Sequence, residues 1–363
     1  MRTPIFRFSV FVVLCVLGLI TVGGLVTSWN AGMAVPDWPL SFGSLNPAGW
    51  WADFAVRLEH GHRLYAASVG VLVGILVAWL HRDFRSLGVA LTAAIVVSVV
   101  GRLLGLSAPA KMHLGLWVPA FCFLAYLSWK ADAGNRLALV GRFAFVLVCV
   151  QATLGGFRVT QETAGSVDVA LVLRVFHGCV AQLFLSLLVM ISCQLSGFGV
   201  PAFSLARGFF GRWVLLSALF MQLIFGATIR HRGAGLAIPT FPAADPDGSW
   251  MLKQHGFLLD LHFTHSRLIP LLVLGLVSWI LWRDSRIEGR LRAVRVLPLA
   301  LVVFQIVLGL SVIWSGRSAG VTTLHVLTGA SLLASVVLNL CVDASGGFRT
   351  VNGLSLIHIS EPT

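Results

Sequence analysis

The chain has 363 residues, of which 57% are hydrophobic and only 11% are charged, and its mean hydropathy is +0.90. A soluble globule carries roughly 25% charged residues. The composition therefore argues against a soluble enzyme, a disordered chain and a nucleic-acid module, and it predicts a polytopic membrane protein. The net charge of +12 is then typical of basic cytoplasmic loops and of residues that meet anionic groups. All six cysteines lie in apolar stretches, so no disulfide framework is expected.

Ten apolar stretches are long enough for membrane helices, since about 20 residues span a bilayer. They are residues 8–28, 61–80, 88–107, 112–129, 141–159, 172–193, 212–230, 259–281, 295–314 and 322–342. The first follows a short basic segment with no small-residue cleavage site, so we expect a helix and not a removed signal peptide. The predicted fold class is therefore all-α, with about ten transmembrane helices.

The loops alternate between short basic ones and two long ones, at about 29–60 and 231–258. By the positive-inside rule the short loops and both termini face the cytoplasm. Four tryptophans of the first long loop are expected to be anchors at the membrane interface, namely Trp29, Trp38, Trp50 and Trp51. The basic loop residues are Arg82, Arg85, Lys130, Arg136, Arg142, Arg207, Arg212, Arg283, Arg286, Arg290, Arg292 and Arg295.

The last ten residues, 354–363, resemble translated sequencing-adapter sequence joined to a truncated frame. We set this probable non-native tail and its His358 aside from the functional argument.

The sequence contains an internal repeat. Ala31–Pro39 matches Ala234–Pro242 at an offset of 203 residues, with five of nine positions identical. Gln151–Gly155 matches Gln305–Gly309 at an offset of only 154. The first half therefore holds 49 extra residues, enough for a helical hairpin at about 88–136. We predict two four-helix units in parallel repeat, 1–200 with the inserted hairpin and 201–345.

Histidines recur at matched positions of the repeat. His62 corresponds to His265, and His177 corresponds to His325. A lone membrane histidine is usually a core hydrogen-bond partner, but four at matched depth favour ligands. Neutral imidazole ligates haem iron, and helix bundles hold cofactors between facing helices. Each pair is predicted to bind a porphyrin, with zinc or copper as alternatives. His113 opens an inserted helix and is an alternative to His177.

One carboxylate and four arginines accompany the histidines. Glu59 lies three residues before His62 on the same helix face, as a candidate proton carrier or as a cap of the helix start. Its counterpart in the second half is His262. The arginines are candidate partners of haem propionates, or they reach lipid phosphates. They are Arg63, Arg158, Arg230 and Arg267.

Several of these motifs together resemble the haem A synthase family. They are Glu59-His60-Gly61-His62-Arg63, Gln151 to Arg158, Phe263-Thr264-His265, His325 at the start of the last span, Gly24 to Thr27, and the Pro-Asp-Trp-Pro segment ending at Pro39. The resemblance covers nearly the whole chain to about residue 342, apart from the hairpin. It implies an eight-helix core of two halves, each with a haem site between two histidines.

The resemblance also implies an activity. Enzymes of this family oxidise a methyl group of haem O to the formyl group of haem A through a hydroxymethyl stage. By position, His62 and His177 would flank the substrate haem, Glu59 would be catalytic, and His265 and His325 would ligate a haem b cofactor. The setting would be a bacterial cytoplasmic membrane, with haem O synthase and cytochrome oxidase assembly as candidate partners. This chain lacks the cysteine pair that some members carry in the first outer loop.

Two other functions use the same histidines. A non-catalytic bis-histidine cytochrome b would move electrons and would not need Glu59. A haem-handling transporter would move haem without oxidising it, and the matched depth of the histidines argues weakly against such a path. The electron acceptor, the oxygen source and the oligomeric state do not follow from the sequence.

Overall fold

The computed structural model describes residues 3–130, 135–199, 207–284 and 290–344, so the probable non-native tail lies outside the described residues. Within them the chain is dominated by helices. These are α1 (Pro4–Ser28), η1 (Ala31–Met33), α2 (Phe54–Leu80), α3 (Arg85–Leu103), α4 (Ala108–Trp129), α5 (Arg136–Thr163), α6 (Val167–Leu195), α7 (Arg207–His231), α8 (Phe257–Phe263), η2 (Thr264–Leu268), α9 (Ile269–Arg283), α10 (Arg290–Trp314) and α11 (Ala319–Ala344).

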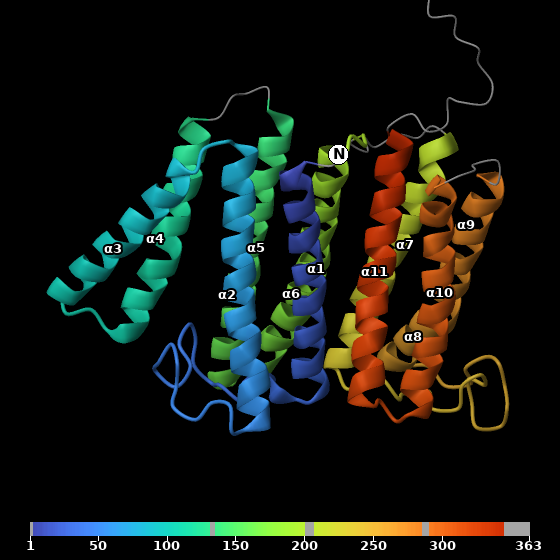
Figure 1. Cartoon of the computed structure of the whole chain (residues 1–363). Coiled ribbons are helices and arrows are strands. Elements are labelled where there is room, and N and C mark those ends of the chain that lie inside the picture. The colour runs from blue at the N-terminus through green and yellow to red at the C-terminus, as the bar shows by residue number, and fades with distance from the viewer. Residues whose placement is uncertain (1–2, 131–134, 200–206, 285–289, 345–363) are drawn as a thin grey trace, which may run out of the picture.

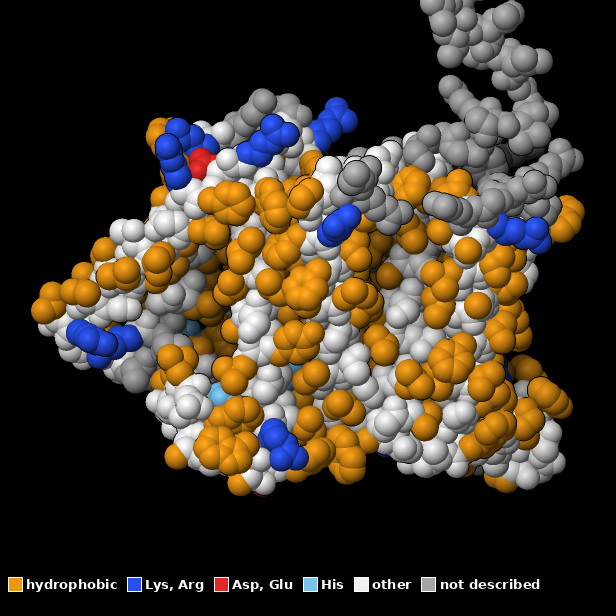
Figure 2. Space-filling model, in the orientation of Figure 1, with side chains coloured by type: hydrophobic (Ala, Val, Ile, Leu, Met, Phe, Trp, Pro, Cys, Tyr) orange, Lys and Arg blue, Asp and Glu red, His pale blue; other side chains and the backbone are white. Residues whose placement is uncertain are grey.

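Nine membrane-length apolar helical segments occur among the described residues, one of which joins α8, η2 and α9 into Phe257–Arg283. Inside α4 the apolar stretch is shorter, His113–Trp129. The prediction of an all-α polytopic membrane protein is confirmed. Figure 2 shows hydrophobic side chains over the flank of the molecule, while Lys and Arg gather toward its two ends. This is the distribution that lipid around the flank requires.

Helix boundaries differ from the prediction at two places that bear on the site. α2 begins at Phe54 and not at residue 61, because the Asp53 side chain caps it by accepting a hydrogen bond from the Val56 N–H at 2.8 Å. Glu59 therefore lies inside α2, as the helix face that it was predicted to share with His62 requires. At its outer end α7 extends to His231, which the sequence placed in the second long loop.

The helices form two groups that share one interface (Figure 1). In the first group α1, α2, α5 and α6 pack around buried residues such as Leu76, Leu185 and Leu188. In the second, α7, α9, α10 and α11 pack around Val273 and Leu333. α1 also packs against α11, so it lies between the groups. The N-terminal end of α1 and the end of α11 lie at one end of the molecule, and the two long loops lie at the other.

The hairpin α3–α4 stands at the edge of the first group (Figure 1). Its inner part is attached through the ring of Phe123, which lies 4.7 Å from the Phe145 ring of α5. Much of its remaining surface is apolar and exposed, for example at Leu103 and Phe121. Lipid covers such a surface in a membrane, so the hairpin adds two spans without entering the helix packing of the second group.

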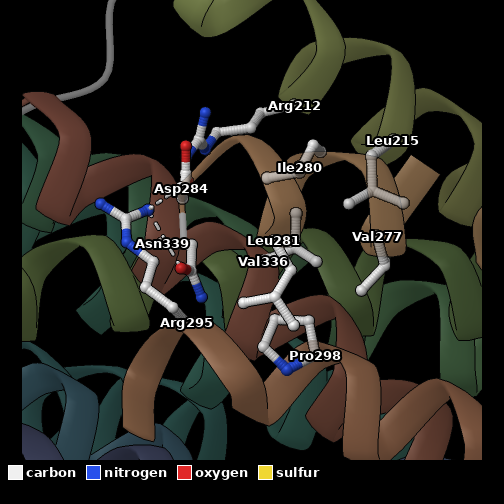
Figure 3. Close-up of a pocket in the computed structure, with 10 residues that line it drawn as sticks. All are labelled: Arg212, Leu215, Val277, Ile280, Leu281, Asp284, Arg295, Pro298, Val336 and Asn339. Atoms are coloured by element: carbon white, nitrogen blue, oxygen red, sulfur yellow. Dashed lines mark hydrogen bonds and ion pairs between the residues drawn. The ribbon is translucent and has the colours of Figure 1, made fainter. Parts of the chain in front are cut away.

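A buried ionic cluster joins the four helices of the second group at the end away from the long loops (Figure 3). Arg212 pairs with Asp284 and Asp343, and Arg295 pairs with Asp343. The two arginines are only 2% and 5% exposed. The expectation that Arg212 and Arg295 are loop charges is therefore wrong: both are helix residues whose charge is neutralised by carboxylates of other helices.

Asn339 of α11 completes this cluster. Its Nδ2 donates to the carbonyl of Val294 at 2.9 Å, and its Oδ1 accepts from Arg295 at 3.1 Å. The Val294 carbonyl is free within α10 because Pro298, four residues later, has no N–H. A cavity of about 20 Å³ lies beside Asn339 and Arg295, which is room for about one water molecule.

Candidate functional site: two histidine pairs

The first pair of histidines lies where the four helices of the first group meet. His62 of α2 lies against α1, since a methyl group on Gly23 would come within 3.1 Å of its Cε1. His177 of α6 lies against Gly155 of α5 in the same way, at 3.2 Å. Gln151 of α5 donates to the His177 carbonyl at 2.8 Å. Each of the two histidines thus faces a glycine of a neighbouring helix in the first group.

The second pair repeats this arrangement in the second group. His265 faces Gly226 of α7, where an added methyl group would lie 2.7 Å from Cε1, and His325 of α11 faces Gly309 of α10 at 3.3 Å. Gly226 and Gly23 are separated by 203 residues, the same offset as the histidines they face. Each of these two histidines again faces a glycine of a neighbouring helix, here in the second group. The four predicted residues are thus brought together in two pairs.

Glutamines support three of the four histidines. Gln222 donates to the His265 carbonyl at 2.7 Å, as Gln151 does for His177. Gln305 places its Nε2 3.2 Å from the His325 Nε2. The sequence analysis did not assign these roles. Gln151 and Gln305 open the repeated motif and were detectable through it, whereas Gln222 corresponds to Leu19 and has no such signal.

The Nδ1 atom of each of the four histidines is buried and has no hydrogen-bond partner. A core histidine would normally satisfy its ring nitrogens, so these side chains are suited to an added ligand. Within the described residues no group of three or more His, Cys, Asp or Glu forms a metal-ion cluster. Paired imidazoles beside glycines would suit a haem group better than a tetrahedral zinc site.

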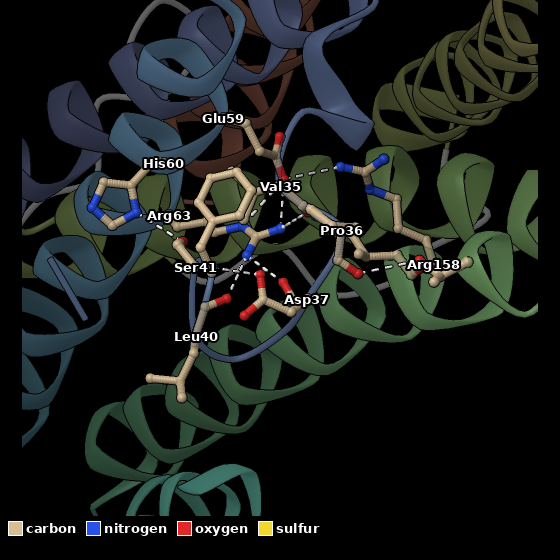
Figure 4. Close-up of polar contacts among 12 residues, drawn as sticks. Val35, Pro36, Asp37, Leu40, Ser41, Glu59, His60, Arg63 and Arg158 are labelled. Carbon is tan, nitrogen blue, oxygen red and sulfur yellow. Dashed lines mark hydrogen bonds and ion pairs between the residues drawn. The ribbon is translucent and has the colours of Figure 1, made fainter. Parts of the chain in front are cut away.

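Glu59 lies three residues before His62 on α2, and Figure 4 shows its carboxyl group between Arg63 and Arg158. Its Oε1 accepts from the Arg63 Nε at 3.2 Å and from the Arg158 Nη2 at 3.4 Å. Its Oε2 is buried without a partner, and the residue is 2% exposed. Two arginines thus hold one oxygen of this carboxyl group, and the other remains able to take a proton.

Arg63 ties the first long loop to the site (Figure 4). Besides Glu59, its guanidinium donates to the carbonyls of Val35, Asp37 and Leu40 at 2.9, 2.6 and 2.9 Å. Nη1 makes two bonds, Nη2 makes two and Nε makes one, so all five donors are used. Arg63 therefore serves the loop and Glu59 and has no donor left for a ligand.

Arg267 has the corresponding role in the second half. It donates to the carbonyl of Ala243 at 2.7 Å, next to Pro242 in the repeated loop motif. Arg63 directly follows His62, but one more residue separates Arg267 from His265. The π-helical turn Thr264–Leu268 takes up that extra residue and returns the arginine to its loop. The counterpart of Glu59, His262, contacts the Gly235 carbonyl at 3.3 Å through its Nε2.

Two more of the predicted residues, Arg158 and His113, lie around the first pair. Arg158 of α5 reaches Glu59 and the backbone at Gly32. His113 contacts the Trp38 ring at 5.2 Å between centroids, and that ring covers Gly156 next to Gly155. Trp38 therefore belongs to the site, and Trp50 packs on His60 at 4.8 Å, while Trp29 and Trp51 are exposed as interfacial anchors would be.

These features define a class of protein: a polytopic helical membrane protein with two like-built histidine pairs, one of which has a buried carboxyl group beside it. The family model described as Cytochrome oxidase assembly protein (COX15-CtaA) matches residues 6–337, so the chain belongs to this family. Among its relatives, the Heme A synthase of Erythrobacter litoralis is 26% identical over 341 residues, which cover 88% of this chain and 91% of that protein.

Two further relatives extend the comparison. The Heme A synthase of Cereibacter sphaeroides is 25% identical over 343 residues, 85% of this chain and 80% of that protein. The Protoheme IX farnesyltransferase of Halobacterium salinarum is 32% identical over 136 residues, 36% of this chain and 29% of that protein. Similarity to proteins named for haem A synthesis thus extends over most of the chain.

Proposed function

We propose that this protein is a haem A synthase, an oxidoreductase that converts a methyl group of haem O to a formyl group through a hydroxymethyl stage. Family membership and the relatives named Heme A synthase support this function. The observation that carries it is the asymmetry of the two histidine pairs. Glu59 stands beside the first pair, whereas His262 takes its place in the second. Two like-built sites with different neighbours suit one substrate and one resident cofactor.

In this proposal His62 and His177 flank the substrate haem, and His265 and His325 hold a haem b. The unpartnered Nδ1 atoms and the glycines opposite each ring support both assignments. When bound, the haem group supplies the oxidation chemistry that side chains lack. His177 faces Gly155 as His325 faces Gly309, whereas His113 packs on the Trp38 ring, and this supports His177 over His113 as the second residue of the first site.

Glu59 is the catalytic residue in this proposal, and its role is to accept a proton at Oε2 as the substrate methyl group is oxidised. Arg63 and Arg158 hold Oε1, which keeps Oε2 directed away from them. Trp38 covers Gly156 and helps to exclude water from the outer side of the site. Because Arg63 has no free donor, Arg158 is the better propionate partner near this site.

The chain is a multi-pass membrane protein, and its setting belongs to the proposal. Both termini would face the cytoplasm in a bacterial inner membrane, and the two histidine pairs would lie toward the outer leaflet. Haem O synthase would supply the substrate, and cytochrome oxidase assembly would use the product. The N-terminal end of α1 and the end of α11 at one end of the molecule support this orientation.

The test is to express the full chain with a haem O supply, purify it and analyse the extracted haems by mass. We expect haem A and its hydroxymethyl precursor beside haem b. Glu59→Gln should keep both haems bound and stop conversion. Glu162→Gln is the matched control. Glu162 lies near the end of α5 and pairs with Arg174 of α6 at 3.0 Å, so this variant also removes a carboxylate that pairs with an arginine. A wild-type preparation that holds only haem b would instead identify a non-catalytic cytochrome.

A further inference from the structure

Helix α1 lies between α2, which carries His62 of the first pair, and α11, which carries His325 of the second. Gly23 faces His62 of the first pair. The next residue, Gly24, faces α11, where an added methyl group would come within 3.1 Å of the Thr323 Cγ2. Thr323 lies two residues before His325 of the second pair. One glycine dipeptide therefore contacts the His62 ring of the first site and the helix that carries His325 of the second.

Arg230 of α7, in the second group, forms hydrogen bonds to α1. Its Nη2 donates to the Gly24 carbonyl at 2.8 Å and to the Ser28 Oγ at 2.8 Å. Ser28 Oγ in turn lies 3.2 Å from the Thr323 Oγ1 on α11. A single guanidinium thus connects α7, α1 and α11 at the level of the histidines.

The charge of Arg230 acts on the second site. Arg230 lies one turn after Gly226 on the same face of α7, and Gly226 faces His265 of the second pair. A charged group at this depth in a membrane protein is costly unless it is bonded or functional, and here α1 supplies two acceptors. A fixed positive charge beside a redox group stabilises the reduced state, because reduction adds negative charge.

The repeat shows that this connection is not a general requirement of the fold. The counterpart of Arg230 in the first half is Thr27, whose hydroxyl donates to the Gly23 carbonyl of its own helix at 3.1 Å. A bridging cation therefore reaches from the second half into α1, and no equivalent cation reaches back from that position.

We propose that Arg230 is a positioning residue shared by the two sites, which through Gly24 and Ser28 links occupancy of the first histidine pair by haem O to the reduction potential of haem b at the second. This inference rests on the proposed function. A ligand beside His62 would press on Gly23 of α1. A displacement of α1 at Gly23 would move the Gly24 carbonyl and, through its hydrogen bond, the Arg230 guanidinium. Such coupling is reciprocal, so the redox state of the second site also alters the affinity of the first.

The experiment is a spectroscopic redox titration of the purified full chain carrying haem b, with and without haem O. In the wild type, haem O should shift the midpoint potential of haem b. In Arg230→Gln the potential should be lower, because a positive charge is lost, and the shift with haem O should disappear. Arg230→Lys should keep the higher potential and lose part of the shift.

Ser28→Ala tests the hydrogen-bond link separately from the positive charge. It removes the bond from Arg230 to the Ser28 hydroxyl and leaves the Arg230 guanidinium in place. It should retain most of the wild-type potential and show a smaller shift with haem O. Thr228→Val is the control on the same helix, because the Thr228 hydroxyl donates only to Ile224 of α7 at 2.8 Å. This control should behave as the wild type.

A wild-type potential and a wild-type shift in Arg230→Gln would overturn the inference, as would a wild type whose potential is indifferent to haem O. Failure of the proposed function is distinguishable, because it would appear as the absence of haem A in extracts of the wild type. A protein that makes haem A and shows an unaltered potential in Arg230→Gln would refute the role of Arg230 alone.

Discussion

At the scale of single residues, the two halves show how one position sets the chemistry of a site. Glu59 and His262 occupy equivalent places, and both are buried, at 2% and 3% exposure. Burial of a carboxyl group requires compensating charge, and Arg63 and Arg158 supply it in the first half. In the second half a histidine bonds to a loop carbonyl instead. The same backbone thus carries an ionisable acid in one site and none in the other.

The glycines that face the histidines give a prediction at this scale. Gly226→Val should abolish haem b binding at the second pair, because even the first added carbon would lie 2.7 Å from the His265 Cε1. The haem b content per protein should fall to background, as measured by the pyridine haemochrome spectrum. Gly275→Val is the matched control, since nothing lies within 4 Å of the added carbon there. Normal haem b content in Gly226→Val would remove this glycine from the site.

The histidines and Glu59 were predictable from the sequence because the repeat marks them twice or places them one turn apart. The sequence predicted Arg63 as a propionate partner. Its bonds to the loop carbonyls were not predictable, because no sequence pattern identifies those carbonyls. Trp38 was interpreted as an interfacial anchor and instead covers Gly156. Side chains that act on backbone atoms of distant segments are the part of the site that composition and spacing do not encode.

At the scale of elements, the two groups differ at the end of the molecule away from the long loops, where one has buried ion pairs and the other an apolar contact. In the second group, arginines and aspartates of four helices pair with one another. In the first group the repeat offset places Gly141 at the position of Arg295, and Leu80 packs where a methyl group on Gly141 would lie, at 2.8 Å. Asn339 and Asp343 correspond to Ile191 and Leu195. An apolar contact in one half thus replaces an ionic cluster in the other.

Breaking that cluster should cost more than breaking a surface pair. Asp343→Asn removes a carboxylate that both Arg212 and Arg295 use, and leaving buried cations uncompensated costs about 3 kcal/mol or more. We expect a lower thermal unfolding midpoint of the haem-loaded protein in detergent. Asp168→Asn is the control, since this side chain is 91% exposed and lies 3.8 Å from Arg232, and exposed pairs contribute roughly 0–1 kcal/mol. Equal midpoints for the two variants would contradict the stabilising role of the cluster.

Helix ends and the π turn show where hydropathy stops being informative. The ten apolar stretches located the helices, but a cap at Asp53 extends α2 beyond its apolar part and brings Glu59 into it. The extra residue after His265 was present in the sequence as a change of spacing to the next arginine, and only the structure shows that a π turn absorbs it. Hydropathy also cannot identify Arg212 as buried, because its partners lie on other helices.

At the scale of the whole molecule, the repeat predicted which helices correspond but not how the halves meet. α1 packs against both α2 and α11, so the first helix of one half forms part of the boundary with the other. Helix α1 therefore contacts both the helix that carries His62 and the helix that carries His325. The inserted hairpin stands at the opposite edge of the first group (Figure 1), away from this boundary. An insertion of two helices is compatible with the core because it preserves the direction of every later helix.

Because the inserted hairpin leaves both long loops at the same end of the molecule (Figure 1), the chain in a membrane should expose both loops on one side. Trp51 and Trp250 lie in the two long loops and are 60% and 70% exposed, while Phe84 lies between α2 and α3 at 51%. In intact cells, a membrane-impermeant thiol reagent should label Trp51→Cys and Trp250→Cys and should not reach Phe84→Cys until the membrane is opened. The native cysteines lie within helices and provide the unlabelled background. The two long loops and the histidine pairs must share one side of the membrane. Labelling of Trp51→Cys without Trp250→Cys would therefore contradict the parallel repeat. Labelling of Phe84→Cys alone would show that the orientation is the reverse of the one proposed.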